Sequence, residues 1–156
     1  MRIQFQGLPT DQVAETRQSG RDAYGQPVEV HPATGDAYPC RHCLGETPLG
    51  RDYLILAWRP FRSTNPYAET GPIFLCADDC KAAKPSARVP AILRSPSYLV
   101  RGYTDDERIL YGTGQVTLTP DIPGYASKLL EDSRIAFVDV RSASNNCFQC
   151  RVVRAK

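Results

Sequence analysis

The residues best suited to chemistry in this chain are six cysteines, and they occur as three close pairs. The pairs are Cys40–Cys43, Cys76–Cys80 and Cys147–Cys150. A CxxC motif in a turn can hold a zinc ion, exchange a disulfide, or only pack as a small apolar group. The choice among these alternatives separates a metal-stabilised fold from a redox protein and from a chain whose thiols have no chemical role.

The zinc interpretation joins the first two pairs. Cys40 and Cys43 lie on a loop, where Gly45 can supply the positive φ that a tight metal-binding turn often needs. Cys76 and Cys80 follow across a predicted strand-to-helix junction, where one turn can bring both thiols to the same side. The expected cofactor is a structural zinc ion, about 2.3 Å from each sulfur of Cys40, Cys43, Cys76 and Cys80. The spacing is looser than in a zinc ribbon, so four unliganded, buried thiols are the alternative.

A thioredoxin-like dithiol is a second interpretation of the Cys40–Cys43 motif. Its Cys-x-His-Cys order is similar to that of strongly oxidising thioredoxin-fold proteins, which place the first cysteine at a helix N-terminus. Here Gly45, Pro48 and Gly50 follow directly, so no helix can continue from Cys43. The sequence context therefore speaks against this redox interpretation.

An enzyme is the alternative to a binding or scaffold module. Cys80 is expected in the first turn of a short helix, which favours a nucleophilic thiolate. His42 can act as its base or as an alternate metal ligand, and Glu69 lies on a loop before a predicted strand. A thiol- or metal-dependent site would then lie near Cys80, His42 and Glu69. The sequence shows no Gly-rich phosphate loop, nucleophile elbow or HExxH helix that would specify a reaction.

The third cysteine pair is not expected to bind one ion. Residues three apart on a strand point to opposite faces, and a strand over Asn146–Val153 would contain both Cys147 and Cys150. Cys150 then shares an apolar face with Phe148 and Val152, which makes it a core residue. Cys147 is left as a spare ligand or as a thiol that lines a cleft.

Two arginines interrupt apolar strands and are further polar candidates. Arg101 and Arg141 are each expected to face outward or to pair with an acid such as Asp139 or Glu69. An inward Arg–carboxylate pair can bind an anion or serve as a structural ion pair. The residue pattern favours the structural ion pair.

Length and composition indicate one ordinary globular domain over residues 1–156. Hydrophobic residues make up 42% and charged residues 23%, and the net charge of +2 does not favour nucleic-acid or anionic-membrane binding. The N-terminal segment lacks the apolar run of a signal peptide, and no apolar run approaches the ~20 residues of a membrane helix. We therefore expect a cytoplasmic protein, in whose reducing surroundings a disulfide framework is disfavoured.

Apolar patterning predicts an α+β fold built mostly from antiparallel β-sheet, with six to eight strands and about three short helices. The expected strands are Ile3–Phe5, Val28–Val30, Tyr53–Trp58, Ile73–Cys76, Tyr98–Tyr103, Arg108–Thr119, Ile135–Arg141 and Phe148–Arg154. Three helices are expected. The first follows Thr10 as its cap, the second runs from Asp78 through Ala82, and the third spans Tyr125–Leu130. Strands adjacent in sequence and joined by short turns favour antiparallel pairing.

Several separated motifs occur in an order that resembles one bacterial family. They are Tyr38–Leu44, Pro60–Phe61, Pro66–Phe74, Val140–Arg141 and Asn146–Phe148. Together they resemble the bacterial domain of unknown function 1203 family, whose members have about this length, and the resemblance covers nearly the whole chain. It implies no established activity. Members of that family often carry His at the position of Cys76, which suits a zinc ligand and equally suits a small polar residue that ends a strand.

Overall fold

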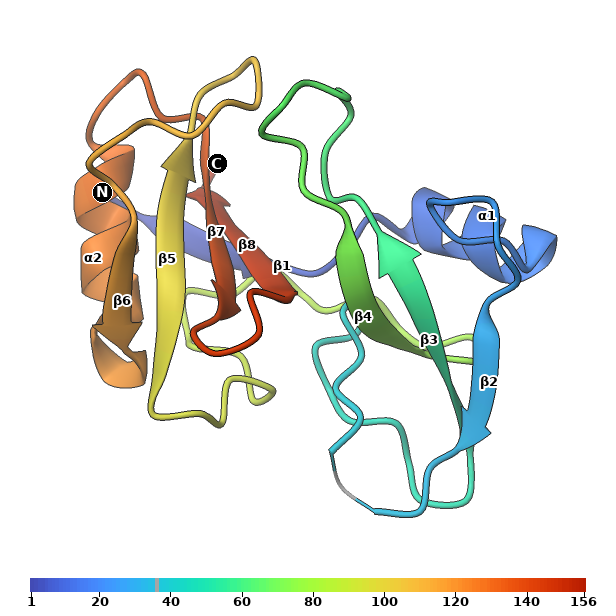
Figure 1. The fold of residues 1–156 in the computed structure, drawn as a ribbon. Coiled ribbons are helices and arrows are strands. Elements are labelled where there is room, and N and C mark those ends of the chain that lie inside the picture. Colours follow the sequence, from blue (N-terminus) through green and yellow to red (C-terminus); the bar gives the residue numbers. More distant parts are fainter. Residues whose placement is uncertain (36) are drawn as a thin grey trace.

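The computed structural model of the chain describes residues 1–35 and 37–156, and Figure 1 shows its path. Its elements in chain order are β1 (Ile3–Gln6), α1 (Thr10–Ser19), β2 (Glu29–Pro32), β3 (Asp52–Trp58), β4 (Gly71–Cys76), β5 (Ser97–Tyr103), β6 (Gln115–Leu118), the 3-10 turn η1 (Thr119–Asp121), α2 (Ile122–Leu130), β7 (Phe137–Ser142) and β8 (Phe148–Arg154). Most of these elements lie within a few residues of the bounds predicted from the apolar patterning.

Two antiparallel sheets carry the eight strands of the described residues. The five-stranded sheet has the order β1-β8-β7-β5-β6, and the three-stranded sheet has the order β2-β3-β4. Helix α2 lies against the five-stranded sheet, and α1 lies beside the three-stranded sheet (Figure 1). The prediction of a mostly antiparallel α+β fold with six to eight strands is therefore confirmed.

The core of the five-stranded sheet follows from the spacing of its apolar residues. Ile122, Ala126 and Leu130 are four residues apart on α2, so they share one helix face, and all three are fully buried. They belong to the same cluster as Val138 and Val140 of the sheet. Strand β7 is buried on both faces, as expected of a central strand.

The second core lies between the three-stranded sheet and α1. Alternation along β3 buries Leu54, Leu56 and Trp58 in one cluster with Val13 of α1. The prediction of a central strand over Tyr53–Trp58 is confirmed, because β3 has a partner on each side. The candidate zinc ligands of the sequence analysis lie at the border of this core.

A β-bulge between β7 and β8 sends one aromatic side chain into the second core. The register passes from Val140 opposite Cys150 to Arg141 opposite Phe148, which leaves Gln149 as an extra residue. The prediction that Phe148 and Cys150 share one face is therefore wrong. Cys150 is buried in the core of the five-stranded sheet, whereas Phe148 packs with the three-stranded sheet and so connects the two.

The described residues form two α-helices, so the prediction of about three is wrong. The segment from Asp78 to Ala82, expected to be helical, has no regular structure. The backbone N–H groups of Ala77 and Ala83 donate to the carbonyls of Asp52 and His42, so tertiary hydrogen bonds replace intrahelical ones. Within the described part of the chain, neither helix has the length and apolar character that a membrane crossing needs.

Helix α1 begins differently from the prediction. Pro9 occupies the N-cap position, and Thr10 is the first helical residue. The Thr10 hydroxyl lies 2.9 Å from Nε2 of His42, which is far away in the sequence. A tertiary contact has taken the place of local capping, and Gly20 with a φ of 64° ends the helix.

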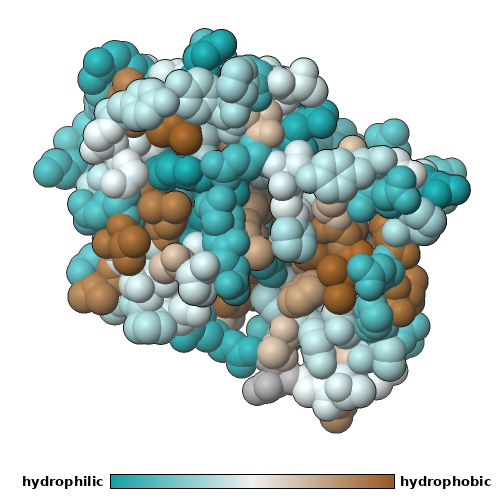
Figure 2. Space-filling model, in the orientation of Figure 1, coloured by the Kyte–Doolittle hydropathy of each residue, from teal (hydrophilic) through white to brown (hydrophobic). Residues whose placement is uncertain are grey.

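The hairpin arm predicted over residues 108–119 is shorter in the structure. Strand β6 pairs with β5 only from Gln115 to Leu118. On this edge strand Val116 and Leu118 are each 60% exposed. Figure 2 shows hydrophobic side chains gathered over this strand, at the left of the view.

Candidate metal centre

Four cysteine sulfurs from distant parts of the chain lie together. The Sγ atoms of Cys40, Cys43, Cys76 and Cys80 are all within 4.8 Å of one another. Those of Cys40 and Cys80 are 3.8 Å apart, and all four thiols are free. Four sulfurs placed tetrahedrally at about 2.3 Å from one ion are about 3.8 Å apart from each other. The cluster therefore has the composition and the size of a tetrahedral zinc–thiolate site.

The first two sulfurs are presented by a tight turn. The N–H of Leu44 donates to the carbonyl of Cys40, and the N–H of Cys40 donates to the carbonyl of Gly45, at 2.9 and 2.8 Å. The residue with positive φ in this turn is Leu44, at 55°, and not Gly45 as predicted. A non-glycine residue in the left-handed region costs about 1–2 kcal/mol, so the surrounding contacts must hold this conformation.

The third and fourth sulfurs come from the end of β4 and the segment after it. Cys76 is the last residue of β4 and lies opposite Tyr53 of β3. The turn docks on the same strand, because the N–H of Arg41 donates to the carbonyl of Phe74. Cys80 follows on residues 77–96, which are all described and contain no helix or strand. Segments of this length without regular structure usually need other anchors, and the cysteine cluster is one such anchor.

Arg17 of α1 and Thr47 place hydrogen-bond donors beside the cluster. The guanidinium of Arg17 donates to Sγ of Cys80 at 3.2 Å and to the carbonyl of Cys76 at 3.1 and 3.0 Å. The hydroxyl of Thr47 lies 3.6 Å from Sγ of Cys76. Donors of this kind orient sulfur ligands and offset the negative charge of thiolates.

His42 lies between α1 and the fourth cysteine. Its Nδ1 atom is 3.1 Å from Sγ of Cys80, and its Nε2 atom faces the Thr10 hydroxyl. Burial, and to a lesser extent the charge of Arg17, lower the pKa of His42, which favours the neutral imidazole. With Nδ1 protonated, the ring donates to the sulfur and accepts from Thr10.

Hydrogen bonds among the thiols make the first proton easy to remove and the next ones difficult. The thiols of Cys43 and Cys76 hydrogen-bond to Cys40 and lower its pKa far below the ordinary value. Contacts with Cys40 and Cys76 raise the pKa of Cys43, and the contact with Cys40 raises the pKa of Cys76 to about 11. Several thiolates can share this space only with a cation among them, which is what a divalent metal supplies.

The structure brings together two of the three residues named for the enzyme alternative. Cys80 and His42 are in contact. The carboxylate of Glu69 instead accepts hydrogen bonds from Arg101 and Asn146 and pairs with Arg141. Glu69 therefore belongs to another cluster, and the nucleophile–base pair is completed by Thr10 rather than by a carboxylate.

The third cysteine pair does not share a strand, because Cys147 lies before β8, whereas Cys150 is a core residue as predicted. Cys150 is fully buried on β8, and burial lifts the pKa of its thiol well above the ordinary value. Cys147 precedes the strand and lines two surface pockets. Among the residues that the structure describes, the group of four is the cluster of metal-ligand type.

Sequence reasoning missed the side chains of α1 that contact the cluster. Thr10, Val13 and Arg17 follow the i, i+3, i+7 pattern of one helix face, and Val13 is fully buried. That pattern could have shown that Thr10 and Arg17 lie on the same helix face as the buried Val13. It could not have shown that this face meets the cysteines.

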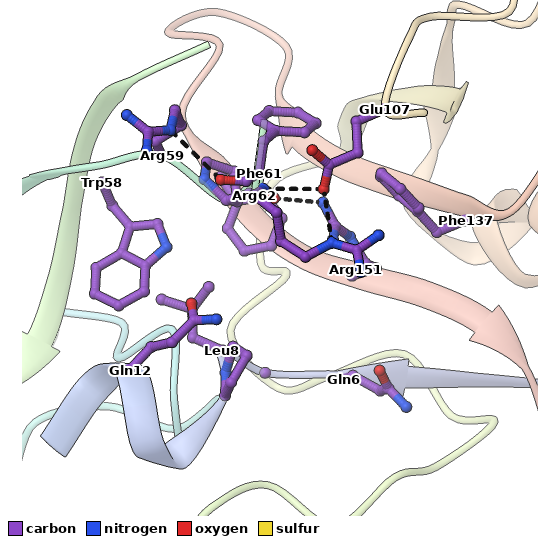
Figure 3. A pocket seen from close by; sticks show the side chains of 14 residues that line it. Gln6, Leu8, Gln12, Trp58, Arg59, Phe61, Arg62, Glu107, Phe137 and Arg151 are labelled. Atoms are coloured by element: carbon purple, nitrogen blue, oxygen red, sulfur yellow. Dashed lines mark hydrogen bonds and ion pairs between the residues drawn. The ribbon is translucent and has the colours of Figure 1, made fainter. Parts of the chain in front are cut away.

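A cleft of about 460 Å³ was also missed. Its lining comes from β1, α1, the segment after β3, and β7 and β8. In Figure 3, Trp58 and Phe137 lie on opposite sides of the view, with Arg62 and Arg151 between them. The indole nitrogen of Trp58 points toward the middle of this view and has no hydrogen-bond partner among the described residues.

Comparison with known proteins gives one result. A family described as "Protein of unknown function (DUF1203)" matches residues 37–154, which include all six cysteines. No curated protein and no solved structure matches the chain. What the chain does has to be inferred from its own geometry.

Proposed function

The chain belongs to the DUF1203 family of proteins of unknown function, and we propose that it is a small binding module stabilised by a structural zinc ion. The proposed ligands are Cys40, Cys43, Cys76 and Cys80. The observation that carries this proposal is the approach of their four sulfurs to within 4.8 Å of one another.

The number of thiols favours a structural role for the metal. Four sulfur ligands complete the tetrahedron of a zinc ion and leave no position for substrate or water, whereas catalytic zinc sites keep one position open. A site of four thiolates also suits iron, so metal analysis must distinguish the two. When bound, the ion supplies positive charge and fixed geometry, and Arg17, His42 and Thr47 stabilise the thiolates from outside.

The position of the cluster explains what a metal would stabilise. The turn at residues 39–46, the end of β4 and the segment 77–96 meet there, and α1 packs on them through Arg17. Only part of this arrangement is held by regular secondary structure. A zinc ion would connect the three segments, and its binding free energy would add to the stability of the fold.

Metal content is the direct test of this proposal. The protein purified without chelator should contain about one zinc per chain, and chelation should lower its melting temperature. Cys76→Ser should lose the metal. Cys147→Ser, a matched change outside the cluster, should keep it. A protein that carries no metal and cannot be loaded with zinc or iron in the reduced state would overturn the proposal.

A thiol enzyme is the second candidate, and the 3.1 Å contact between His42 Nδ1 and Cys80 Sγ favours it. In this case Cys80 is the nucleophile and His42 its base. Alkylation of the reduced protein with iodoacetamide near neutral pH separates the two proposals. One fast-reacting thiol at Cys80 in a metal-free protein supports the enzyme, and protection of all four cysteines by zinc supports the structural site.

We also propose that residues 1–156 form one domain that resides in a reducing compartment such as the cytoplasm. Phe148 of the five-stranded sheet packs in the core of the three-stranded sheet, which supports a single cooperative unit. The free thiols of all six cysteines support the reducing compartment. A single unfolding transition seen alike by fluorescence and circular dichroism would be expected of one domain.

A further inference from the structure

The outer strands of the two sheets differ in how their free edges are protected. The segment at Ser86 bridges to the edge of β1, and the turn that begins with Cys40 bridges to the edge of β4. Strand β2 carries Glu29 and Pro32, a charge and a proline that discourage pairing with a further strand. Strand β6 contains neither charge nor proline, and in the described part of the chain it has no neighbour beyond β5.

The backbone of β6 directs hydrogen-bonding groups to this free edge. The N–H of Thr119 donates to the carbonyl of Pro96. These two residues flank the opposed pair of Ser97 and Leu118. In an antiparallel ladder such a bond lies beside a non-hydrogen-bonded pair, so the N–H and C=O of Leu118 point away from β5. Those of Val116, two residues earlier, point the same way, and both residues are free to pair with another strand.

The side chains of the same two residues are apolar and exposed. Val116 and Leu118 are each more than half exposed, and they share one face of the strand because they are two residues apart. Leu99 of β5 lies opposite Val116 on this face and is half-buried. Figure 2 shows the hydrophobic side chains that gather here. An apolar strand with an unguarded edge is a template for pairing with a second strand.

The groove between β6 and α2 adds one acid and one base. Asp121 and Lys128 line it, and both are exposed. Neither forms an ion pair or side-chain hydrogen bond within the described residues. The hydroxyl of Tyr125 donates to the carbonyl of Thr113 at 2.8 Å, so α2 runs back along β6 (Figure 1). Asp121 therefore lies by the end of β6, and Lys128 lies toward its beginning.

We propose that β6 pairs antiparallel with β6 of a second copy of this chain, which joins their five-stranded sheets into one. The two-fold axis passes between the two copies of Thr117, so Val116 of each copy lies opposite Leu118 of the other. These are the residues whose backbone groups point outward, and each such pair exchanges both of its N–H···O hydrogen bonds. The apolar side chains of the pair cover one another on one face of the joined sheet.

Charge complementarity favours a second copy over a strand of another protein. The two-fold axis keeps both copies of α2 on one face of the joined sheet and reverses their direction. Asp121 of one copy and Lys128 of the other then lie on the same side of the axis, so opposite charges meet at both ends of the interface. An isologous interface needs a surface that is complementary to itself. This edge supplies the apolar pair and the charge pair from its own residues.

The interface is small, so the dimer should be reversible. A strand of four residues buries less than the roughly 1,200 Å² at the lower limit of stable complexes. We expect a dissociation constant on the order of 10–100 µM. The four clustered cysteines do not line this groove, so the dimer does not depend on the zinc proposal.

Sedimentation equilibrium of the full-length chain measures the dimer, with reducing agent present so that no disulfide joins two copies. The average mass should rise toward that of two chains between about 5 µM and about 1 mM protein. Val116→Lys places a charge in the apolar pair and should weaken the dimer by about tenfold or more. Val30→Lys makes the same change at an exposed apolar residue of the edge strand β2 and should leave the dimer unchanged.

Charge reversal identifies the partner as a second copy. Asp121→Lys alone and Lys128→Asp alone each bring like charges together and should each weaken the dimer several-fold. An equimolar mixture of the two variants brings opposite charges together in the mixed pair and should dimerise about as strongly as the unmodified protein. Non-specific association would not produce this rescue.

Three results would overturn the proposal. They are a monomer at about 1 mM protein, a dimer that Val30→Lys and Val116→Lys weaken equally, and a mixture of the charge variants that dimerises no better than either variant alone. A monomer would leave this edge to a strand of another protein. If Val116→Lys does not fold, the charge variants still decide the question, because both of their positions are exposed.

Discussion

The Nδ1 atom of His42 lies 3.1 Å from the Sγ atom of Cys80, although the two residues lie on different segments that meet only in the folded chain. The Thr10 hydroxyl holds the opposite side of the same ring at 2.9 Å. In a zinc–thiolate site this arrangement makes His42 a donor to a ligand rather than a ligand itself. Outer groups of this kind usually change metal affinity by about 10–100-fold.

The two ring nitrogens of His42 can be tested separately. The amide of Asn reaches the position of Nδ1, so His42→Asn should keep a donor to Cys80 and retain most of the zinc affinity. The amide of Gln reaches the position of Nε2, so His42→Gln should lower affinity by about tenfold. Competition with a chromophoric chelator measures both. Equal affinities in the two variants would contradict a donor role for Nδ1.

Arg17 should set the electrostatic balance of the site. Arg17→Met removes the donors to Cys80 and to the carbonyl of Cys76, and zinc affinity should fall by about tenfold or more. Arg17→Lys keeps the charge and should give an intermediate value. The same chelator competition ranks the zinc affinities of these variants. Arg21→Met serves as an exposed control on the segment that follows the helix. A variant Arg17→Met that binds zinc as well as the unmodified protein would show that the guanidinium is only structural.

Leu44 combines a buried side chain with a left-handed backbone. The residue is 7% exposed at a φ of 55°. Both Leu44→Ala and Leu44→Gly lose the buried side chain, at about 2–4 kcal/mol. Glycine also relieves the backbone strain, so Leu44→Gly should be the more stable of the two by about 1 kcal/mol. Urea unfolding of the zinc-loaded proteins gives this difference, and a less stable Gly variant would speak against strain at this position.

Glu107 should contribute stability that depends on pH. Its buried carboxylate accepts the N–H groups of Arg62 and Ser63 at 2.9 and 2.7 Å. Burial raises its pKa, but these hydrogen bonds and the Arg62 side chain hold the pKa below the usual range. A lowered pKa means that the stabilisation is present above the ordinary value of about 4.3 and is lost as the pH falls through the folded value.

Glu107→Gln tests this dependence. At neutral pH the variant should be less stable by about 1–3 kcal/mol, because two buried N–H groups lose a charged acceptor. The difference from the unmodified protein should shrink as the pH falls below the ordinary carboxyl value of about 4.3 and through the lower folded value, where Glu107 becomes protonated. Urea unfolding at several pH values measures the difference in the free energy of unfolding between the two proteins. Effects common to both, such as the loss of a metal in acid, cancel in this difference. A difference that stays constant with pH would contradict a stabilising carboxylate.

Much of the fold could be predicted because its signals are local. The apolar run over Tyr53–Trp58 predicts a central strand, and the alternation along Ile3–Phe5 predicts a short first strand, and both are present. The failure at Asp78–Ala82 has a clear cause. A short helix is weak by itself, and the N–H groups of the flanking residues Ala77 and Ala83 donate to Asp52 and His42 instead.

The candidate site could be predicted in part for the same reason. Residue types and spacing identify Cys40, Cys43, Cys76 and Cys80 as a set of metal-ligand type. The spacing of Cys147 and Cys150 on a strand indicates that these two thiols do not bind one ion together. Register cannot be obtained in this way, because the β-bulge at Gln149 depends on how β8 pairs with β7. That one extra residue turned Phe148 toward the second core.

The sequence by itself determined which side chains can ligate a metal and which segments form strands, since both depend on residue type and short-range order. Only the tertiary structure decided that the four sulfurs of Cys40, Cys43, Cys76 and Cys80 converge. It also decided that Arg17 and His42 face Cys80. These relations join residues tens of positions apart, and they depend on the packing of two sheets rather than on any local preference of the chain.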